Sequence, residues 1–237
     1  MDLSYTFRKV SVFLFLYLTG ISLAGLGAAI THKPSLHFAL RRFHGGTGDF
    51  FFGCYTHLGT IFVLIAAVLL FLSFRRWKTA ASIGTAFALA SLVAQGLKHL
   101  LQLPRPWFYF EQLSKSMPAH ANLTLWVPEG VDLASKTSPS FPSGHAATAA
   151  VLFLGLTFFA GQNHIAPTLQ RLIQIICLGA LALVAYSRVY LSFHFIEDVL
   201  VGSLIGVLAT CLTFPFVDYL WYQFSFPLGK DRFLNGV

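Results

Sequence analysis

The sequence contains six apolar stretches of about the length that crosses a membrane, within a chain of 237 residues. A transmembrane helix needs about 20 mainly apolar residues to cross about 30 Å of hydrocarbon. The stretches cover residues 10–30, 58–74, 79–97, 146–161, 172–187 and 199–217. Because a helix satisfies its own backbone hydrogen bonds in lipid, we predict an all-α polytopic membrane protein. The expected architecture is a six-transmembrane-helix bundle in a single domain over residues 1–237.

The composition supports this class and excludes others. Apolar residues make up 56 % of the chain and charged residues only 11 %, whereas a soluble domain carries roughly 25 % charged residues. The net charge of +7 does not indicate nucleic acid, because the Lys and Arg residues are scattered through short loops. The first apolar stretch is about twice as long as the core of a signal peptide, which favours a retained helix.

The basic residues in short loops predict the orientation of the bundle. With the N-terminus inside, the cytoplasmic side receives Arg8, Lys9, Arg75, Arg76, Lys78, Arg171, Lys230 and Arg232. The opposite side also holds cations, but these belong to a proposed site. We therefore expect both ends in the cytoplasm and the long polar segment 99–141, between the third and fourth helices, outside. Its aromatic start indicates either an interfacial belt or a lid over a lipid headgroup.

Three groups of polar residues fall at the ends of predicted helices. The groups are Lys98 with Arg105; Ser143, Gly144 and His145; and Arg188 with His194 and Asp198. The third helix leaves the membrane near the first group, the fourth enters near the second, and the fifth and sixth flank the third. All three groups are therefore expected on one membrane face. Charges near a bilayer are costly, so such a cluster indicates function.

The cluster has the chemistry of a phosphate site. Lys98, Arg105 and Arg188 provide three positive charges, and guanidinium groups match phosphate oxygens. Ser143 and Gly144 stand where the fourth helix begins, and free N–H groups and the helix dipole favour an anion there. These five residues are the candidate phosphate-binding residues.

Two histidines and one carboxylate have the pattern of a covalent catalyst. His194 and Asp198 are four residues apart, so the carboxylate can accept a hydrogen bond from one ring nitrogen and leave the other free to attack. His145, from another helix, can protonate the leaving oxygen. We expect a phosphohistidine intermediate, with His194, His145 and Asp198 as the catalytic residues.

Each residue taken alone has an ordinary structural explanation, such as a snorkelling cation, a helix cap or a satisfied interfacial histidine. A metal site formed by His145, His194 and Asp198 is disfavoured, because three neighbouring cations oppose a divalent ion. We therefore expect no metal and no other cofactor. Partners for the remaining histidines are not evident from the sequence: His32, His37, His44, His57, His99, His120 and His164.

The polar groups resemble the three signatures of the type 2 phosphatidic acid phosphatase superfamily. The first is Lys98, six residues, then Arg105-Pro106; the second is Pro142-Ser143-Gly144-His145; the third is Ser187-Arg188, five residues, His194, three residues, Asp198. All three are complete and in order over the signature region 98–198. The resemblance implies the same roles for these residues as the chemistry does.

The resemblance also implies hydrolysis of a lipid phosphate without a metal ion, in a bacterial cytoplasmic membrane, with the site facing the periplasm or exterior. The substrates it implies are undecaprenyl diphosphate, phosphatidylglycerophosphate, phosphatidic acid and the phosphates of lipid A. One alternative is a phosphotransferase that passes the phosphate to another lipid. A second is a transporter or flippase whose cationic mouth only binds a lipid phosphate. The expected partners are the substrate and membrane lipids, with the oligomeric state left open.

Overall fold

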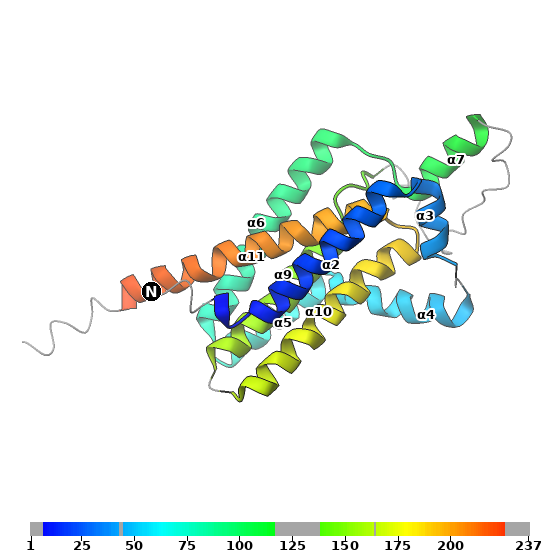
Figure 1. The fold of residues 1–237 in the computed structure, drawn as a ribbon. Coiled ribbons are helices and arrows are strands. Elements are labelled where there is room, and N and C mark those ends of the chain that lie inside the picture. The colour runs from blue at the N-terminus through cyan, green and yellow to red at the C-terminus, as the bar shows by residue number, and fades with distance from the viewer. Residues whose placement is uncertain (1–6, 43–44, 117–137, 164, 226–237) are drawn as a thin grey trace, which may run out of the picture.

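The computed structural model describes residues 7–42, 45–116, 138–163 and 165–225, and within them the chain forms helices and no strands. Five of these helices are long and apolar enough to cross a membrane, and together they form one bundle (Figure 1). They are α2 (Ser11–Ile30), α6 (Trp77–Leu101), α9 (Gly144–Gln162), α10 (Pro167–Tyr190) and α11 (Ile196–Ser225). The prediction of an all-α membrane bundle is confirmed.

The predicted span over residues 58–74 forms part of a bent pair. Helix α4 (Gly46–Tyr55), a 3₁₀ turn η1 (Thr56–Gly59) and helix α5 (Ile61–Ser73) follow one another with a bend of 50°. Helix α5 alone is about 20 Å long at 1.5 Å per residue, so it is shorter than the hydrocarbon core. The bundle has six spans only if the bent pair counts as one.

Gly59 allows η1 to pack closely on two neighbouring helices. A Cβ atom on Gly59 would lie 2.8 Å from the backbone oxygen of His145 and 2.8 Å from a side-chain carbon of Val184. Only glycine allows η1 to approach helices α9 and α10 so closely. The turn therefore rests directly on the first residues of α9.

Helix α9 is the central element of the bundle. It packs against α6, α10 and α11, and most of its residues are buried. Small residues fill its first two turns, including Ala146, Ala147, Ala149 and Ala150, and larger apolar residues predominate after them. Small residues let helix backbones approach closely in a membrane, where packing rather than the hydrophobic effect drives association.

Helix α11 approaches α9 through two glycines four residues apart. A Cβ on Gly202 would lie 2.3 Å from the backbone oxygen of Ser143, and a Cβ on Gly206 would lie 2.3 Å from that of Ala147. The spacing predicts close helix packing, and this prediction is confirmed. It fixes the start of α9 against the start of α11.

Two short helices gather at the end of the bundle where α9 and α11 begin (Figure 1). They are α3 (Lys33–Leu40) and α7 (Pro106–Ser116). In α7, Trp107 is 5 % exposed and Phe110 is 1 % exposed, so these two rings form neither a belt nor a lid and instead pack inside the protein. The rest of the predicted lid, residues 117–137, lies outside the described residues.

Candidate active site

The three sequence-predicted groups lie at one end of the bundle. Lys98 and Arg188 stand in the last turns of α6 and α10, which run three or four residues further than predicted. Ser143 is the N-cap of α9, and Gly144 and His145 open that helix. His194 lies in the loop 191–195, here called the nucleophile loop, and Asp198 lies in the first turn of α11.

His194 and Asp198 form a buried pair. The Nδ1 atom of His194 lies 3.3 Å from Oδ2 of Asp198, and each residue is 2 % exposed. The predicted hydrogen bond is therefore present, although His194 precedes α11 rather than sharing its first turn. The backbone N–H of Phe195 also donates to Asp198 Oδ2 at 3.0 Å. Because Nδ1 faces the carboxylate, Nε2 is the nitrogen left for chemistry.

Ser140 joins this pair, and nothing in the sequence marked it. Its hydroxyl donates to Oδ2 of Asp198 and lies 3.3 Å from Nδ1 of His194. The residue is fully buried, and its backbone N–H donates to the oxygen of Leu103 at 2.8 Å. A serine shortly before a recognised helix cap carries no distinguishing pattern. Only the fold shows that it supports the carboxylate.

We expect Ser140→Ala to lower kcat about tenfold, because a hydrogen bond to a charged group is worth about 1.5–3 kcal/mol. The carboxylate of Asp198 would lose one donor and hold His194 less firmly. The measurement is turnover of a lipid phosphate by purified protein, with a thermal melt to verify folding. Wild-type kcat in the folded variant would show that this hydrogen bond does not support the pair.

Arg188 is buried at 7 % exposure and keeps one nitrogen without a partner. Its Nη1 donates to the hydroxyl of Thr56 at 2.9 Å, and its guanidinium stacks over the ring of Phe193 at 4.2 Å. The buried Nε has no partner among the described residues. Because a buried, unpaired donor on a charged group is costly, an anion beside Arg188 would complete its hydrogen bonds. Thr56, on η1, is a second residue that the sequence did not reveal.

Lys98 and Arg105 lie in the same electrostatic neighbourhood. The charge of Lys98 interacts with Arg105, Asp198 and Arg188. Both cations also bind the segment that leads into α9. Lys98 Nζ donates to the oxygen of Pro139 at 2.9 Å, and Arg105 Nε donates to Ser138 Oγ at 3.0 Å. The side chains predicted to bind phosphate therefore also position the anion-binding helix start.

The start of α9 has the features expected of an anion site. The hydroxyl of Ser143 accepts from the backbone N–H of Ala146 at 3.4 Å, and the backbone N–H of Ser143 donates to the oxygen of Asp198 at 2.9 Å. A Cβ on Gly144 would meet nothing within 4 Å. Open space above Gly144 and a helix N-terminus behind it favour a bound phosphoryl group.

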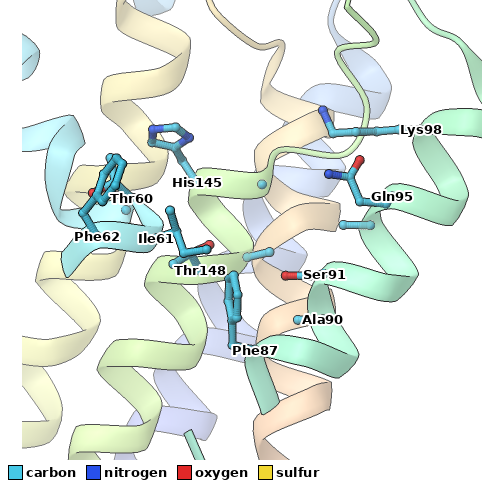
Figure 2. A pocket seen from close by; sticks show the side chains of 14 residues that line it. Thr60, Ile61, Phe62, Phe87, Ala90, Ser91, Gln95, Lys98, His145 and Thr148 are labelled. Atoms are coloured by element: carbon cyan, nitrogen blue, oxygen red, sulfur yellow. The ribbon is translucent and has the colours of Figure 1, made fainter. Parts of the chain in front are cut away.

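His145 opens onto a cavity. Its charge interacts with Arg188, His194 and Arg105, so the two catalytic candidates belong to one electrostatic site. Together with Lys98 and Gly144, it lines a cavity of about 330 Å³ between η1, α5, α6 and α9. Figure 2 shows Lys98 and His145 at one end of this cavity and Phe87 toward the other.

The burial of His194 determines its protonation state. Burial lowers the pKa of His194 below its ordinary value, and the hydrogen bond to Asp198 opposes this shift. Arg188 and Arg105 lower the pKa further. The imidazole is therefore neutral at physiological pH, as a nucleophile requires.

The sequence and the fold of this chain are similar to those of known proteins. The family model of the PAP2 superfamily matches residues 79–222, which include every predicted site residue. The chain belongs to the PAP2 superfamily. It is 37 % identical over 82 residues to phosphatidylglycerophosphatase B of Bacillus subtilis (strain 168). That match covers 34 % of this chain and 40 % of the relative, so it spans less than half of the relative's length.

Two solved structures share the fold of this PAP2 protein. The crystal structure of Aquifex aeolicus LpxE has a TM-score of 0.55 and 25 % sequence identity, covering 76 % of this chain and 93 % of that one. A transmembrane PAP2 type phosphatidylglycerolphosphate phosphatase from Bacillus subtilis has a TM-score of 0.62 and 24 % sequence identity. That match covers 90 % of this chain and 97 % of the solved one. The helical bundle described above is thus shared with two solved structures, one of them a transmembrane protein.

Proposed function

We propose that this PAP2 protein hydrolyses a lipid phosphate or diphosphate through a phosphohistidine intermediate. The cavity beside His145 is the main support. Its polar end carries Lys98, Gly144 and His145, and its other walls are largely apolar, including Ile61, Phe62, Phe87, Ala90, Ala94 and Ala147. Such a cavity suits a phosphate attached to a hydrocarbon chain. The chain would enter laterally between α5 and α6, while the phosphate reaches the cationic end.

In the first step, Nε2 of His194 attacks phosphorus and the bond to the leaving oxygen breaks. His145 takes up a proton as the phosphate dianion binds beside it, because a nearby negative charge favours the imidazolium. It then gives that proton to the leaving oxygen, and Asp198 stabilises the positive charge that forms on His194. Lys98, Arg105, Arg188 and the N–H groups at the start of α9 stabilise the charge on the phosphoryl oxygens. The products are the dephosphorylated lipid and a phosphohistidine.

In the second step, water attacks the phosphohistidine. His145, now neutral, accepts a proton from the water, and the phosphorus–nitrogen bond breaks to release inorganic phosphate. Cationic side chains provide the electrostatic stabilisation throughout, so we expect activity to be insensitive to chelators. A strict requirement for a divalent ion would contradict this proposal.

The site is proposed to face the outside of a bacterial cytoplasmic membrane. The cations distant from it include Arg75 and Arg76, between α5 and α6, and Lys78 in the first turn of α6. The positive-inside rule places such residues in the cytoplasm. The named relative favours phosphatidylglycerophosphate as a substrate. Undecaprenyl diphosphate, phosphatidic acid and lipid A phosphates are the other candidates.

The deciding experiment is a panel of these lipid phosphates offered to purified protein in detergent, scored by kcat/KM with and without EDTA. Release of inorganic phosphate supports the hydrolase and excludes a pure transporter. Mass spectrometry of products with an added acceptor lipid separates hydrolysis from phosphotransfer. No phosphate release from any member would overturn the proposal.

A substitution that narrows the cavity is expected to impair hydrolysis of a long-chain lipid phosphate but not of a short phosphate monoester. Ser91 lines the cavity, so Ser91→Trp should lower kcat/KM for a long-chain lipid phosphate about tenfold or more, because chain burial contributes about 0.8 kcal/mol per CH₂. For a short, water-soluble phosphate monoester, kcat/KM of Ser91→Trp should equal that of the wild type. Leu92, 73 % exposed on the neighbouring face of α6, gives the control Leu92→Trp. Equal losses for both substrates would contradict lateral entry.

A further inference from the structure

Helix α3, which lies outside the three signatures and outside the residues matched by the family model, carries a buried histidine behind the nucleophile loop. His37 is 2 % exposed, and its Nε2 lies 3.0 Å from the hydroxyl of Ser192. Ser192 is fully buried. The sequence showed no partner for His37, and the structure corrects that interpretation, because residues 155 positions apart in the chain meet here.

We propose that His37 is a positioning residue, which fixes the nucleophile loop through Ser192 and thereby aims His194 at the phosphorus atom. This inference rests on the proposed function of His194. His37 touches neither the reacting atoms nor the phosphate-binding cations in the contacts described. Its effect is carried through Phe193, the one residue between Ser192 and His194.

The backbone of the loop explains why it needs an external contact. Ser192 has a φ of 56°, in the left-handed region that residues other than glycine rarely adopt, so its backbone is strained. The backbone N–H of His194 donates to the oxygen of Arg188 at 3.1 Å, within the same tight turn. A change in the backbone at Ser192 would therefore move His194 relative to Arg188.

Helix α3 and the residue that follows it contact the chain on both sides of Ser192. Arg41, 7 % exposed, donates from Nε to the oxygen of Tyr190 at 2.8 Å. The ammonium of Lys33 lies 4.0 Å from the ring centre of Phe195. The ring of His37 packs between Phe195, at 5.2 Å, and Phe110 of α7, at 5.5 Å. Lys33 and His37 of α3, with Arg41 just after the helix, thus contact the chain immediately before the loop, in its middle and at its end.

The imidazole of His37 is a polar group in an aromatic setting. Burial lowers its pKa to about 3, and the nearby charges of Arg41 and Lys33 also lower it. His37 is therefore neutral at physiological pH, and its contact with Ser192 is an uncharged hydrogen bond. Its Nδ1 is buried without a partner among the described residues. An apolar residue would avoid that cost, so the bond to Ser192 gives a reason for a histidine at this position.

The test compares three variants of the full-length protein in detergent. His37→Leu and Ser192→Gly each remove one side of the hydrogen bond, and glycine tolerates the positive φ at residue 192. His37→Gln can place an amide nitrogen near the position of Nε2. His32→Leu, at an exposed histidine just before α3, is the matched control. Each is assayed for kcat, KM and inhibition by orthovanadate and by inorganic phosphate.

Orthovanadate and phosphate report different things. Vanadate adopts the five-coordinate geometry of the transition state when the attacking nitrogen is in line, whereas phosphate needs only the cations. We expect His37→Leu and Ser192→Gly to lower kcat about 30- to 100-fold, the loss that a misplacement of about 1 Å can cause. Vanadate inhibition should weaken by a similar factor, while KM and phosphate inhibition stay within about twofold, as expected for a transition-state effect.

Further outcomes decide whether His37 positions His194 or only stabilises the fold. His37→Gln should recover most of kcat, and the double variant His37→Leu/Ser192→Gly should be no slower than the worse single variant. Wild-type kcat in folded Ser192→Gly would overturn the proposal, even if His37→Leu does not fold. Equal weakening of vanadate and phosphate inhibition would also overturn it. Loss of activity in the wild-type panel described above would instead remove the proposed function.

Discussion

Replacing His194 by Ala is expected to abolish phosphate release, with kcat at least about 1,000-fold below the wild type, as for loss of a nucleophile in other covalent catalysts. The variant removes the only atom proposed to bond phosphorus. The measurement is inorganic phosphate released from a lipid phosphate by purified protein. Brief incubation with a ³²P-labelled substrate should trap label on the wild type and leave His194→Ala unlabelled.

The control is His57→Ala. His57 is an exposed histidine on η1 whose charge interacts with His145, so it shares the neighbourhood without belonging to the proposed mechanism. It should keep turnover within a few-fold of the wild type. If folded His194→Ala retained more than a few per cent of activity, the assignment of the nucleophile would be wrong.

Gly202→Ala is expected to damage both the fold and the site. The added methyl would lie 2.3 Å from the backbone oxygen of Ser143 and 3.1 Å from its nitrogen, so α9 and α11 must separate. Overpacking of this kind costs about 1–3 kcal/mol. The shift falls on the N-cap of the anion-binding helix, so kcat/KM should fall about 100-fold. The measurements are the melting temperature in detergent and kcat/KM for a lipid phosphate.

Gly179→Ala is the matched control for this substitution. Gly179 lies in α10, and a Cβ there would meet nothing within 4 Å. Alanine favours a helix over glycine by up to about 1 kcal/mol, so Gly179→Ala should melt no lower than the wild type and keep its activity. Wild-type behaviour of Gly202→Ala would mean that the two helices can separate without disturbing the start of α9.

Much of the site could be predicted because its residues lie close to helix ends. Lys98, Ser143, Arg188 and Asp198 each stand within a turn of a boundary that hydropathy alone locates approximately. Consecutive transmembrane helices run in opposite directions through a bilayer, so the end of one span and the start of the next span share a face. That rule brings the signatures together without any knowledge of packing. The spacing of Gly202 and Gly206 likewise indicated a close helix contact.

Other features depend on contacts between distant parts of the chain. Thr56 lies just before the predicted span 58–74, and it meets Arg188 only because η1 packs against α9 and α10. Ser140 reaches Asp198 only after the segment before α9 is folded back against α11. Neither residue type, nor its position in the sequence, distinguishes these side chains from ordinary turn or cap residues.

Three properties can be derived without knowledge of the fold: the membrane class of the protein, the number of its apolar stretches and the residues capable of phosphate chemistry. These follow from composition and from local periodicity, which depend on neighbours in the chain. The tertiary structure alone decided the bend in the second span, the burial of Trp107 and Phe110, and the contact between His37 and Ser192. Those depend on which helix surfaces fit together, a property of shape in three dimensions that no local pattern encodes.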